Sequence, residues 1–543
     1  MDPEGLLREV GEFGLYQRLT LLFFGFYHIV LAMNHMGLVF IMESPDHRCR
    51  VDPLDSSGLS FDEVRNISIP RSVDGTWSRC SMYEVNYSLG QHIVNHTVAD
   101  CKDGWVYDQS DIISSAATEF DLVCERAWLR AVASSIYFLG DLTGSIALGI
   151  ISDSYGRRTA LLVGSFGSLV AAVTSALAPV FPLFVFLRFL VSTFTTGAEI
   201  VAYVYIVEIV SSRYSLLVVE LSHAFFTVGY VIVAGMGYAL RNHTHFILAV
   251  AGCHSVCLGT FFLVPESVRW LYAKGRRQKA WQIFSKIAEI NGRAAPKMIR
   301  QDGTHRPTSQ VPKVIPEGHK TPLANFCYSR RWRIHTFLLS AVWGIIGLMY
   351  FTLSLNSSNI GGDIYTNFLL LATIEIPGLV VAVLLPLYLG RKKPISASMF
   401  LGGIILLASL AVPLENNVGQ AAIAVLGKMT GFFAYCVIYA YGCEVFPTAV
   451  RSFGVGIGMF SGSLGAILSS YVLQLSDISR HIPLVVCGAL SILGGLLMLP
   501  LPETKGKTLT ETVNVDEAEK KLRKEGYDKR TFTIERRYDI PAR

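Results

Sequence analysis

Long apolar runs alternate with short polar links through most of the chain. Hydrocarbon about 30 Å thick needs about 20 apolar residues at the helical rise of 1.5 Å, and runs of this length recur too often for a soluble fold with one core. We therefore predict an all-α membrane protein with twelve transmembrane helices, at 16–41, 131–152, 159–179, 182–206, 215–239, 246–264, 334–354, 364–388, 394–412, 418–442, 454–474 and 482–501.

The residues before the first run indicate whether it is a signal peptide. Asp2, Glu4, Glu9 and Glu12 make this stretch acidic overall, whereas a cleavable signal has a basic start and a shorter apolar core. We expect an uncleaved first helix and a cytoplasmic N-terminus. Composition agrees, because 51% of the residues are hydrophobic and 16% are charged, against about 25% charged in soluble domains.

The first long polar segment, residues 43–130, has the features of an extracellular loop. It holds four of the ten cysteines, and three closely spaced glycosylation sequons begin at Asn66, Asn86 and Asn95. Disulfides and N-glycans both belong to the oxidising outer or lumenal side of a membrane. Four cysteines allow three pairings, and their spacing does not choose among them.

The second long polar segment, residues 265–332, is rich in lysine and arginine beside the preceding run. Basic residues near spans stay on the cytoplasmic side, and the stretch KAWQIFSKIAEI has the spacing of a short amphipathic helix. A solvated face near anionic lipid explains the basic charge better than a nucleic-acid partner. This cytoplasmic loop separates an N-terminal half, 1–264, from a C-terminal half, 333–501, and a cytoplasmic tail, 502–543.

Charged motifs recur in the two halves at nearly one spacing. Three pairs of residues mark them, at offsets of 234, 236 and 237: Gly156 and Gly390, Glu208 and Glu444, Glu266 and Glu503. Parallel repeats related by an axis along the membrane normal are the architecture of major facilitator transporters. We therefore predict two pseudo-symmetric six-helix bundles with the major facilitator fold.

The repeated motifs lie where helices reach the cytoplasmic boundary, and we expect them to form gating salt bridges. A carboxylate there can pair with the arginine of a neighbouring helix. We predict that such pairs join the two halves and break when the protein opens inward; the residues are Asp153, Arg157, Glu208, Arg213, Arg391, Glu444 and Arg451. The alternative is that the basic residues only anchor helix ends in lipid headgroups. Leu387 stands where the repeat would place the counterpart of Asp153. We therefore expect the salt bridges around Arg391 to be weaker or differently paired.

Short motifs spread along most of the chain form a specific combination: GEFGLYQ, PDHRC, CKDGWVYD, TEFDLVC, SDSYGRR, PESVRWLYAKGR, GGDIYTN, IEIPG, EVFPTAVR and LPETKGKTL. With them the sequence resembles the organic cation, carnitine and organic anion transporters, solute carrier family 22 of the major facilitator superfamily. The resemblance implies a plasma-membrane transporter of small organic ions that works by alternating access. It also implies disulfides between Cys49 and Cys101 and between Cys80 and Cys124.

Three carboxylates fall near mid-depth of their runs and are candidates for substrate binding. They are Glu375 in the eighth run, Glu199 in the fourth and Asp141 in the second. A charge in hydrocarbon costs about 2.5–3.5 kcal/mol on insertion scales, so such acids favour a cationic or zwitterionic substrate. Glu375 also matches an acidic position of the family. For each acid, the alternative is a structural pair with a basic residue or a protonated carboxyl bonded to a neighbouring helix.

Further substrate-binding candidates come from aromatic spacing and from the resemblance. Trp343 and Tyr350 are two helical turns apart in the seventh run, and Tyr203 matches a family position along the pathway. Aromatic rings can attract a cation, although in membrane helices they also face lipid or core. Ser463 stands where many relatives carry a charge, so the residue that would indicate the charge of the substrate is neutral here.

No enzyme signature stands out. The polar segments hold no metal-ligand cluster, nucleophile elbow or phosphate loop, so we expect no cofactor and no metal. A receptor-like or scaffold protein that does not transport is the rival reading, and an organic anion carrier also stays open. Coupling to Na⁺ or H⁺ and the oligomeric state are undetermined, and His28, His35 and His223 could relay protons or simply pack.

Overall fold

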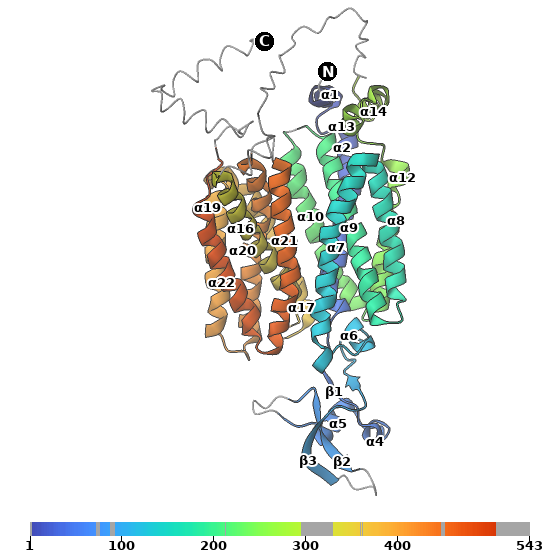
Figure 1. Cartoon of the computed structure of the whole chain (residues 1–543), viewed down its shortest axis with the longest axis vertical. Helices are drawn as coiled ribbons and strands as arrows, with labels where there is room; N and C mark the ends of the chain where they lie inside the picture. The colour runs from blue at the N-terminus through green and yellow to red at the C-terminus, as the bar shows by residue number, and fades with distance from the viewer. Residues whose placement is uncertain are drawn as a thin grey trace, which may run out of the picture.

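Helices dominate the computed structural model, which describes residues 3–505 except 72–76, 87–92, 212, 295–329, 359, 361 and 447–450. Within these residues, twelve helical segments are long and apolar enough to cross a membrane, and each coincides with a predicted run. Figure 1 shows two bundles side by side, one for each half of the chain. The predicted membrane fold with two six-helix halves is confirmed.

The spans of the N-terminal half (N-half) are α2 (Leu15–Met36) continued by α3 (Leu38–Ile41), α7 (Trp128–Tyr155), α8 (Arg157–Ala176), α9 (Phe181–Ile209), α10 (Ser215–Ala239), and α11 (His243–Cys257) continued by α12 (Thr260–Leu263). Those of the C-terminal half (C-half) are α16 (Arg330–Leu355), α17 (Ile364–Thr373) continued by α18 (Glu375–Leu389), α19 (Lys392–Leu407), α20 (Asn417–Val445), α21 (Arg451–Gln474) and α22 (His481–Met498). Short 3₁₀ turns, η2 (Ala408–Ala411) and η3 (Leu475–Asp477), follow α19 and α21.

The two halves meet along two seams, α7 against α21 and α10 against α17 and α18. Inside each half, glycines let helix backbones approach closely. A Cβ atom on Gly144 of α7 would lie 2.0 Å from the Thr193 carbonyl oxygen of α9, and one on Gly465 of α21 would lie 2.2 Å from that of Gly344 in α16. Such close packing drives helix association in lipid, where burial of apolar surface does not.

A small disulfide-bonded unit projects beyond one end of the bundles (Figure 1). It contains the antiparallel pairs β1 (His47–Cys49) with β4 (Trp105–Tyr107) and β2 (Ser81–Asn86) with β3 (Ile93–Asp100), and the helices α4 (Asp52–Asp55) and α5 (Phe61–Ser68). Two shorter elements, α6 (Ala116–Glu119) and η1 (Cys124–Arg126), lead from it to α7. The predicted disulfides Cys49–Cys101 and Cys80–Cys124 are both formed.

All three sequons lie in this unit. Asn66 is exposed on α5, and the backbones of Asn86 and Asn95 belong to β2 and β3. The side chains of Asn86 and Asn95 are outside the described residues. Glycosylation at the three positions therefore stays a prediction.

The opposite end of the bundles carries α1 (Pro3–Val10), α13 (Val268–Ala273) and α14 (Arg277–Ile290) (Figure 1). The predicted amphipathic helix is α14, and its Phe284 packs with Leu6 and Val10 of α1. Asn291, just after α14, donates from Nδ2 to the Val10 carbonyl at 2.9 Å. The start of the basic segment is thus folded onto the N-half, while its residues 295–329 and the tail from 506 onward lie outside the described residues.

Candidate functional site

The predicted carboxylate Glu375 is the first residue of α18, directly after the break that separates α17 from α18. It is fully buried, and one carboxylate oxygen lies 3.0 Å from Nζ of Lys428 in α20. The hydroxyls of Tyr350 and Thr227 each donate a hydrogen bond to Glu375 at 2.9 Å. Because Thr227 belongs to α10, this charged site lies on a seam between the halves.

Lys428 reaches Glu375 from the neighbouring helix α20. Its Nζ atom also donates to the Ser354 hydroxyl and lies 4.7 and 4.3 Å from the ring centres of Tyr230 and Tyr350. A buried charge is tolerated only when it is paired and hydrogen-bonded. In this structure Glu375 therefore forms an ion pair with Lys428 and is not a free carboxylate that a cationic ligand could contact.

Glu199 of α9 also has a basic partner but keeps some exposure. Its Oε1 atom lies 2.9 Å from Nε2 of His28 in α2, and 15% of its side-chain surface is accessible. The other ring nitrogen of His28 lies 3.2 Å from the Phe24 carbonyl, which orients the imidazole. The pair is negative when His28 is neutral and carries no net charge when His28 is protonated.

Asp141 of α7 is enclosed on several sides. Its Oδ2 atom lies 2.9 Å from Nε2 of His35, and its Oδ1 atom accepts hydrogen bonds from Ser192 and, at 2.6 Å, from Thr196. These partners come from α2 and α9, so the carboxylate joins three helices of the N-half. All three mid-depth acids thus have the structural pairing that was the alternative to direct substrate contact.

Two of the predicted aromatic residues, Trp343 and Tyr350, pack behind other tyrosine rings. Trp343 is 1% exposed and fills a slot beside Gly458, where a Cβ atom would lie 2.1 Å from the indole ring. Its ring centre is 5.2 Å from that of Tyr439, while Tyr350 stacks on Tyr435 at 4.7 Å. Tyr435 and Tyr439 keep partial exposure, so a ligand would meet these two rings before Trp343 or Tyr350.

Half-buried side chains between the two halves form what we call the central cluster: Glu199, Tyr203, Glu220, His223, Tyr435 and Tyr439. Glu199, Glu220 and Tyr439 all lie within electrostatic range of Tyr203, and the His223 ring is 5.8 Å from that of Tyr439. The cluster draws on α9 and α10 of the N-half and on α20 of the C-half. Ser463 of α21 is also half-buried, and its hydroxyl donates to the Met459 carbonyl at 3.2 Å.

Glu220 and Tyr435 were missed by the sequence analysis. Glu220 lies near the start of its apolar run, where an acidic residue is usually taken to mark the membrane boundary. The signal that could have identified it is the Glu-x-x-His spacing with His223, since residues three apart share one helix face. Tyr435 was one of many tyrosines in membrane runs, and no spacing distinguished it.

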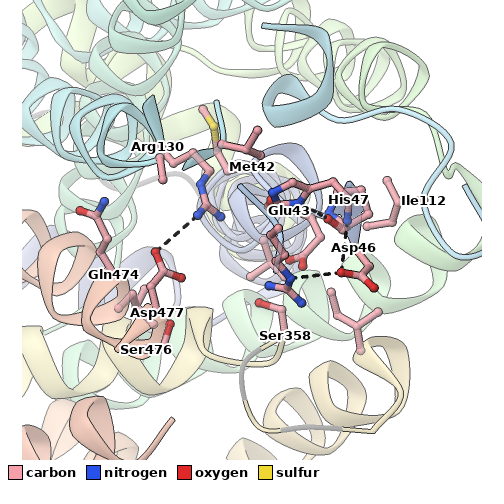
Figure 2. A pocket seen from close by; sticks show the side chains of 18 of the residues that line it. Met42, Glu43, Asp46, His47, Ile112, Arg130, Ser358, Gln474, Ser476 and Asp477 are labelled. Carbon is pink, nitrogen blue, oxygen red and sulfur yellow. Dashed lines mark hydrogen bonds and ion pairs between the residues drawn. The ribbon is translucent and has the colours of Figure 1, made fainter. Parts of the chain in front are cut away.

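At the end that carries the disulfide-bonded unit (the outer end), a cavity of about 700 Å³ lies between this unit and both halves (Figure 2). Arg130 of α7 forms an ion pair with Asp477 of η3 at 3.7 Å, so this contact crosses from one half to the other. Glu43, which follows α3, lies close to Ser358 of the C-half. Polar contacts therefore join the two halves at the outer end.

Glu43 has an unusual protonation equilibrium for a carboxyl group. Burial raises its pKa to about 7, even though the neighbouring Ser358 hydroxyl and the charges of Arg130 and Arg79 act in the opposite direction. Its charge therefore changes across the neutral range of pH. This places a titratable group at one of the contacts between the halves.

At the other end (the inner end), Arg157 at the start of α8 connects several elements of the N-half. Its guanidinium lies 2.8 Å from Glu208 of α9 and 2.9 Å from Asp153 of α7. Glu266, after α12, accepts the backbone N–H of Arg157 at 2.8 Å and so satisfies a free donor at the helix N-terminus. Gly156 makes room, because its φ is +110° and a Cβ atom there would lie 2.1 Å from Glu266.

The C-half repeats this arrangement. Arg391 lies 3.0 Å from Glu444 of α20, and its backbone N–H donates to Glu503 at 3.0 Å. Gly390, with φ of +84°, sits against the Glu503 carboxylate. Burial acts to raise the pKa of Glu503, but the backbone N–H donors around it outweigh that effect and hold the pKa below its usual range.

The two inner networks differ in one respect. Asp153 gives Arg157 a second carboxylate partner, whereas Leu387 at the matching position of α18 is exposed and apolar. Among the described residues, the Arg391 side chain pairs with one carboxylate, that of Glu444. The expected weakening of the second network is therefore visible in its geometry.

Both networks bear on the predicted gating pairs. The described pairs lie inside one half each, because the repeat brings three motifs of the same bundle together; that these residues also join the halves in another state stays a prediction. Arg213 is exposed and its guanidinium lies 5.8 Å from the centre of the Tyr214 ring, and the side chain of Arg451 is outside the described residues. The described ion pair that does cross is Arg130–Asp477, at the outer end.

Comparisons with known proteins agree with this architecture. Residues 79–515 match a family model described as sugar (and other) transporter. The chain is 31% identical to the organic cation transporter protein of Drosophila melanogaster over 94% of both chains, and 32% identical to solute carrier family 22 member 1 of Oryctolagus cuniculus over 96% of both. The chain belongs to solute carrier family 22. It is thus a multi-pass membrane transporter of the major facilitator superfamily.

Two further comparisons place this solute carrier more closely. It is 31% identical to the human organic cation/carnitine transporter 2, covering 94% of this chain and 93% of that protein. Among solved structures, the xylose transporter XylE from E. coli, in a partially occluded inward open conformation, matches with a TM-score of 0.57, covering 91% of this chain and 100% of the other. Sequence identity to XylE is 15%, so this likeness concerns the fold alone.

Proposed function

We propose that this solute carrier moves small organic cations or zwitterions across the plasma membrane by alternating access. One observation carries the proposal: the central cluster holds the carboxylates Glu199 and Glu220 beside three tyrosines. Two basic side chains inside the spans do not offset this negative charge. Lys428 pairs with Glu375, and the buried Arg188 lies over the Tyr137 ring. A cationic group would therefore meet negative charge and aromatic faces.

Each part of the cluster has a role in this proposal. The carboxylates attract the cationic group, and the faces of Tyr203, Tyr435 and Tyr439 add cation–π attraction of about 0.5–2 kcal/mol each. The carboxylate of a zwitterion would accept hydrogen bonds from tyrosine hydroxyls or from His223. Ser463, being neutral, would neither repel nor select either charge.

The remaining candidates act behind this surface. Trp343 and Tyr350 pack against the half-buried Tyr439 and Tyr435. Asp141 connects three helices of the N-half. Glu375 contributes charge to the substrate site in conformations that draw Lys428 away from it. The names of the relatives, which include organic cation and carnitine transporters, support this class of substrate.

The position of the polar contacts supports alternating access. The outer contacts, Arg130–Asp477 and Glu43–Ser358, must separate when the pathway opens outward. The inner networks around Arg157 and Arg391 would stay intact, so that each half moves as one body. The basic segment and both termini lie in the cytoplasm in this scheme, and the disulfide-bonded unit lies outside the cell.

Uptake of radiolabelled carnitine, betaine, choline, ergothioneine, monoamines and dicarboxylates into proteoliposomes tests the proposal, with and without Na⁺ and a pH gradient. We expect a cationic or zwitterionic compound to accumulate, and Glu199→Gln to reduce its uptake about tenfold or more at unchanged protein amount. Glu415→Gln is the matched control, because that acid is exposed outside the central cluster. Uptake of dicarboxylates alone would indicate an anion carrier, and no uptake at all would favour the receptor-like reading.

A further inference from the structure

We propose that Glu220, His223 and Cys436 form a binding site for a zinc-like transition-metal ion between the two halves. A carboxylate oxygen, an imidazole nitrogen and the sulfur of these residues all lie within 4.8 Å of one another. Glu220 and His223 are three residues apart on α10, and Cys436 faces them from α20. The inference rests on this geometry. The site shares Glu220 and His223 with the central cluster, but the metal-binding test below does not depend on which substrate is carried.

Two of the three ligand atoms have unsatisfied hydrogen-bonding capacity. Oε2 of Glu220 and Nδ1 of His223 are buried, lie 3.9 Å apart, and have no hydrogen-bond partner of ordinary geometry among the described residues. The imidazole also faces the carbonyl of Val219 one turn earlier, but outside those geometric limits. Unsatisfied buried polar atoms are costly, and a cation placed between them would remove that cost.

The donor set selects the kind of ion. A thiolate and an imidazole are the ligands that zinc and its neighbours prefer, whereas calcium and magnesium prefer oxygen ligands. Bonds of about 2.0–2.3 Å in a tetrahedron put ligand atoms about 3.3–3.8 Å apart. The 3.9 Å between Glu220 and His223 is close to this range. The sulfur of Cys436 lies within 4.8 Å of both other ligand atoms, so it needs to approach by at most about 1 Å. Three protein ligands leave the fourth position for water.

A second group of potential ligands shows what the site requires. His47, Cys80 and Cys124 also lie within 4.8 Å of one another, but the two sulfurs are joined in a disulfide. Neither sulfur can become a thiolate ligand while that bond is intact. Cys436 has a free thiol, so the central site can bind metal under conditions in which the outer group cannot.

Binding would have two physical consequences. The thiol proton of Cys436 is released when the metal binds, so the apparent affinity rises with pH. The ion would also connect α10 of the N-half to α20 of the C-half. Because alternating access requires the halves to move relative to each other, a bound metal would hold them in the arrangement described here.

Cobalt is a suitable probe, since a Co²⁺–thiolate bond gives a near-ultraviolet charge-transfer band and tetrahedral Co²⁺ absorbs strongly in the visible. The full chain, purified in detergent and freed of metal, would be titrated with Co²⁺ and then with Zn²⁺. We expect the band to saturate at one equivalent and to disappear when Zn²⁺ displaces cobalt. Cys436→Ser should abolish it, while Cys443→Ser, which removes an exposed thiol of the same helix, should leave it unchanged.

Glu220→Gln and His223→Gln keep the thiol and test the other two ligands. Each should weaken cobalt binding at least tenfold, since even changes around a metal's ligands cost roughly 10–100-fold. Elution as a single species in size-exclusion chromatography verifies that a variant is folded. The proposal is overturned if the wild-type chain shows no thiolate band, if Cys436→Ser retains it, or if Glu220→Gln binds cobalt as tightly as the wild type. The last result is decisive even if Cys436→Ser does not fold.

Discussion

The two ends of this transporter use charged residues differently. At the outer end, polar contacts run between the halves, from Arg130 to Asp477 and from Glu43 to Ser358. At the inner end, the described networks around Arg157 and Arg391 stay inside one half each. The inner networks are repeated and their central arginines are well enclosed, whereas the outer ion pair Arg130–Asp477 is single and more solvated.

This difference separates two functions. Enclosed networks with several partners keep the helices of a bundle together, and they need not break during transport. Single, partly solvated pairs contribute little stability, about 0–1 kcal/mol, and so can form and break as the protein changes state. The structure thus represents a state in which the outer ends are held together.

The strongest test of this comparison is Arg157→Ala. It leaves the enclosed carboxylate of Glu208 without its cation, and breaking a buried pair in this way costs about 3–5 kcal/mol. We expect the largest fall in melting temperature for this variant in detergent. Arg391→Ala is the matched change in the C-half and should cost about half as much, because Arg391 has one carboxylate side-chain partner. A fall as large for Arg391→Ala as for Arg157→Ala would contradict the described asymmetry.

Gly156→Ala should destabilise the N-half by about 2 kcal/mol. A side chain at positive φ costs about 1–2 kcal/mol, and the added methyl group would also displace Glu266 from the start of α8. Gly149→Ala in the preceding helix is the control, since its Cβ atom would meet nothing within 4 Å. Thermal unfolding of both variants measures the difference, and equal melting temperatures would show that Glu266 does not hold this helix end.

The outer contact at Glu43 should respond to pH. Its raised pKa means that the state with joined outer ends binds the proton more tightly than a state in which the carboxyl is hydrated. That contribution is fully present below the ordinary value of 4.5 and is lost as pH rises to the value of about 7. Raising the external pH from 5 to 8 should therefore favour outward opening, by about tenfold for a part-buried group.

Labelling of a cysteine at Ser134, which lines the outer cavity, can follow this opening with an impermeant maleimide. The labelling rate, corrected for reagent reactivity at each pH, should rise with pH in the Ser134→Cys protein. Glu43→Gln should remove the pH dependence while preserving the shape of the side chain. A pH dependence that persists in Glu43→Gln would assign the effect to another group.

The smallest effect is expected from Asp477→Asn. The Asp477 side chain is 54% exposed and its pair with Arg130 spans 3.7 Å, so the loss should be below about 1 kcal/mol. The same labelling assay should show a rate increase of about two- to fivefold, and high salt should reduce the difference from wild type. A change of a hundredfold would mean that this pair, rather than packing along the seams, holds the outer end together.

Features with a long-range sequence period were predictable. The apolar runs predicted the twelve spans, because whether a run is long enough to cross the hydrocarbon layer depends only on that run. The offsets between Gly156 and Gly390 and between Glu266 and Glu503 revealed the repeat. The disulfide pairing, by contrast, came from family resemblance, since four cysteines do not determine their own partners.

Contacts between helices were much harder to predict. Lys428 and Glu375 lie on different helices, and nothing in the sequence fixes how far each helix is shifted along its axis. For the same reason His28 and His35 were considered as proton relays or packing residues before the structure showed them beside Glu199 and Asp141. Whether an ion pair lies within a bundle or between bundles also depends on helix arrangement, which the gating prediction could not anticipate.

The repeated inner networks also suggest how such a protein could arise. Among the residues that the structure describes, Arg157, Glu208 and Glu266 come together without a contact from the other half, as do Arg391, Glu444 and Glu503. A six-helix ancestor with all the residues of one inner network could therefore have assembled with a copy of itself. After gene fusion, one copy could lose an acid, as at Leu387, without leaving its arginine unpaired.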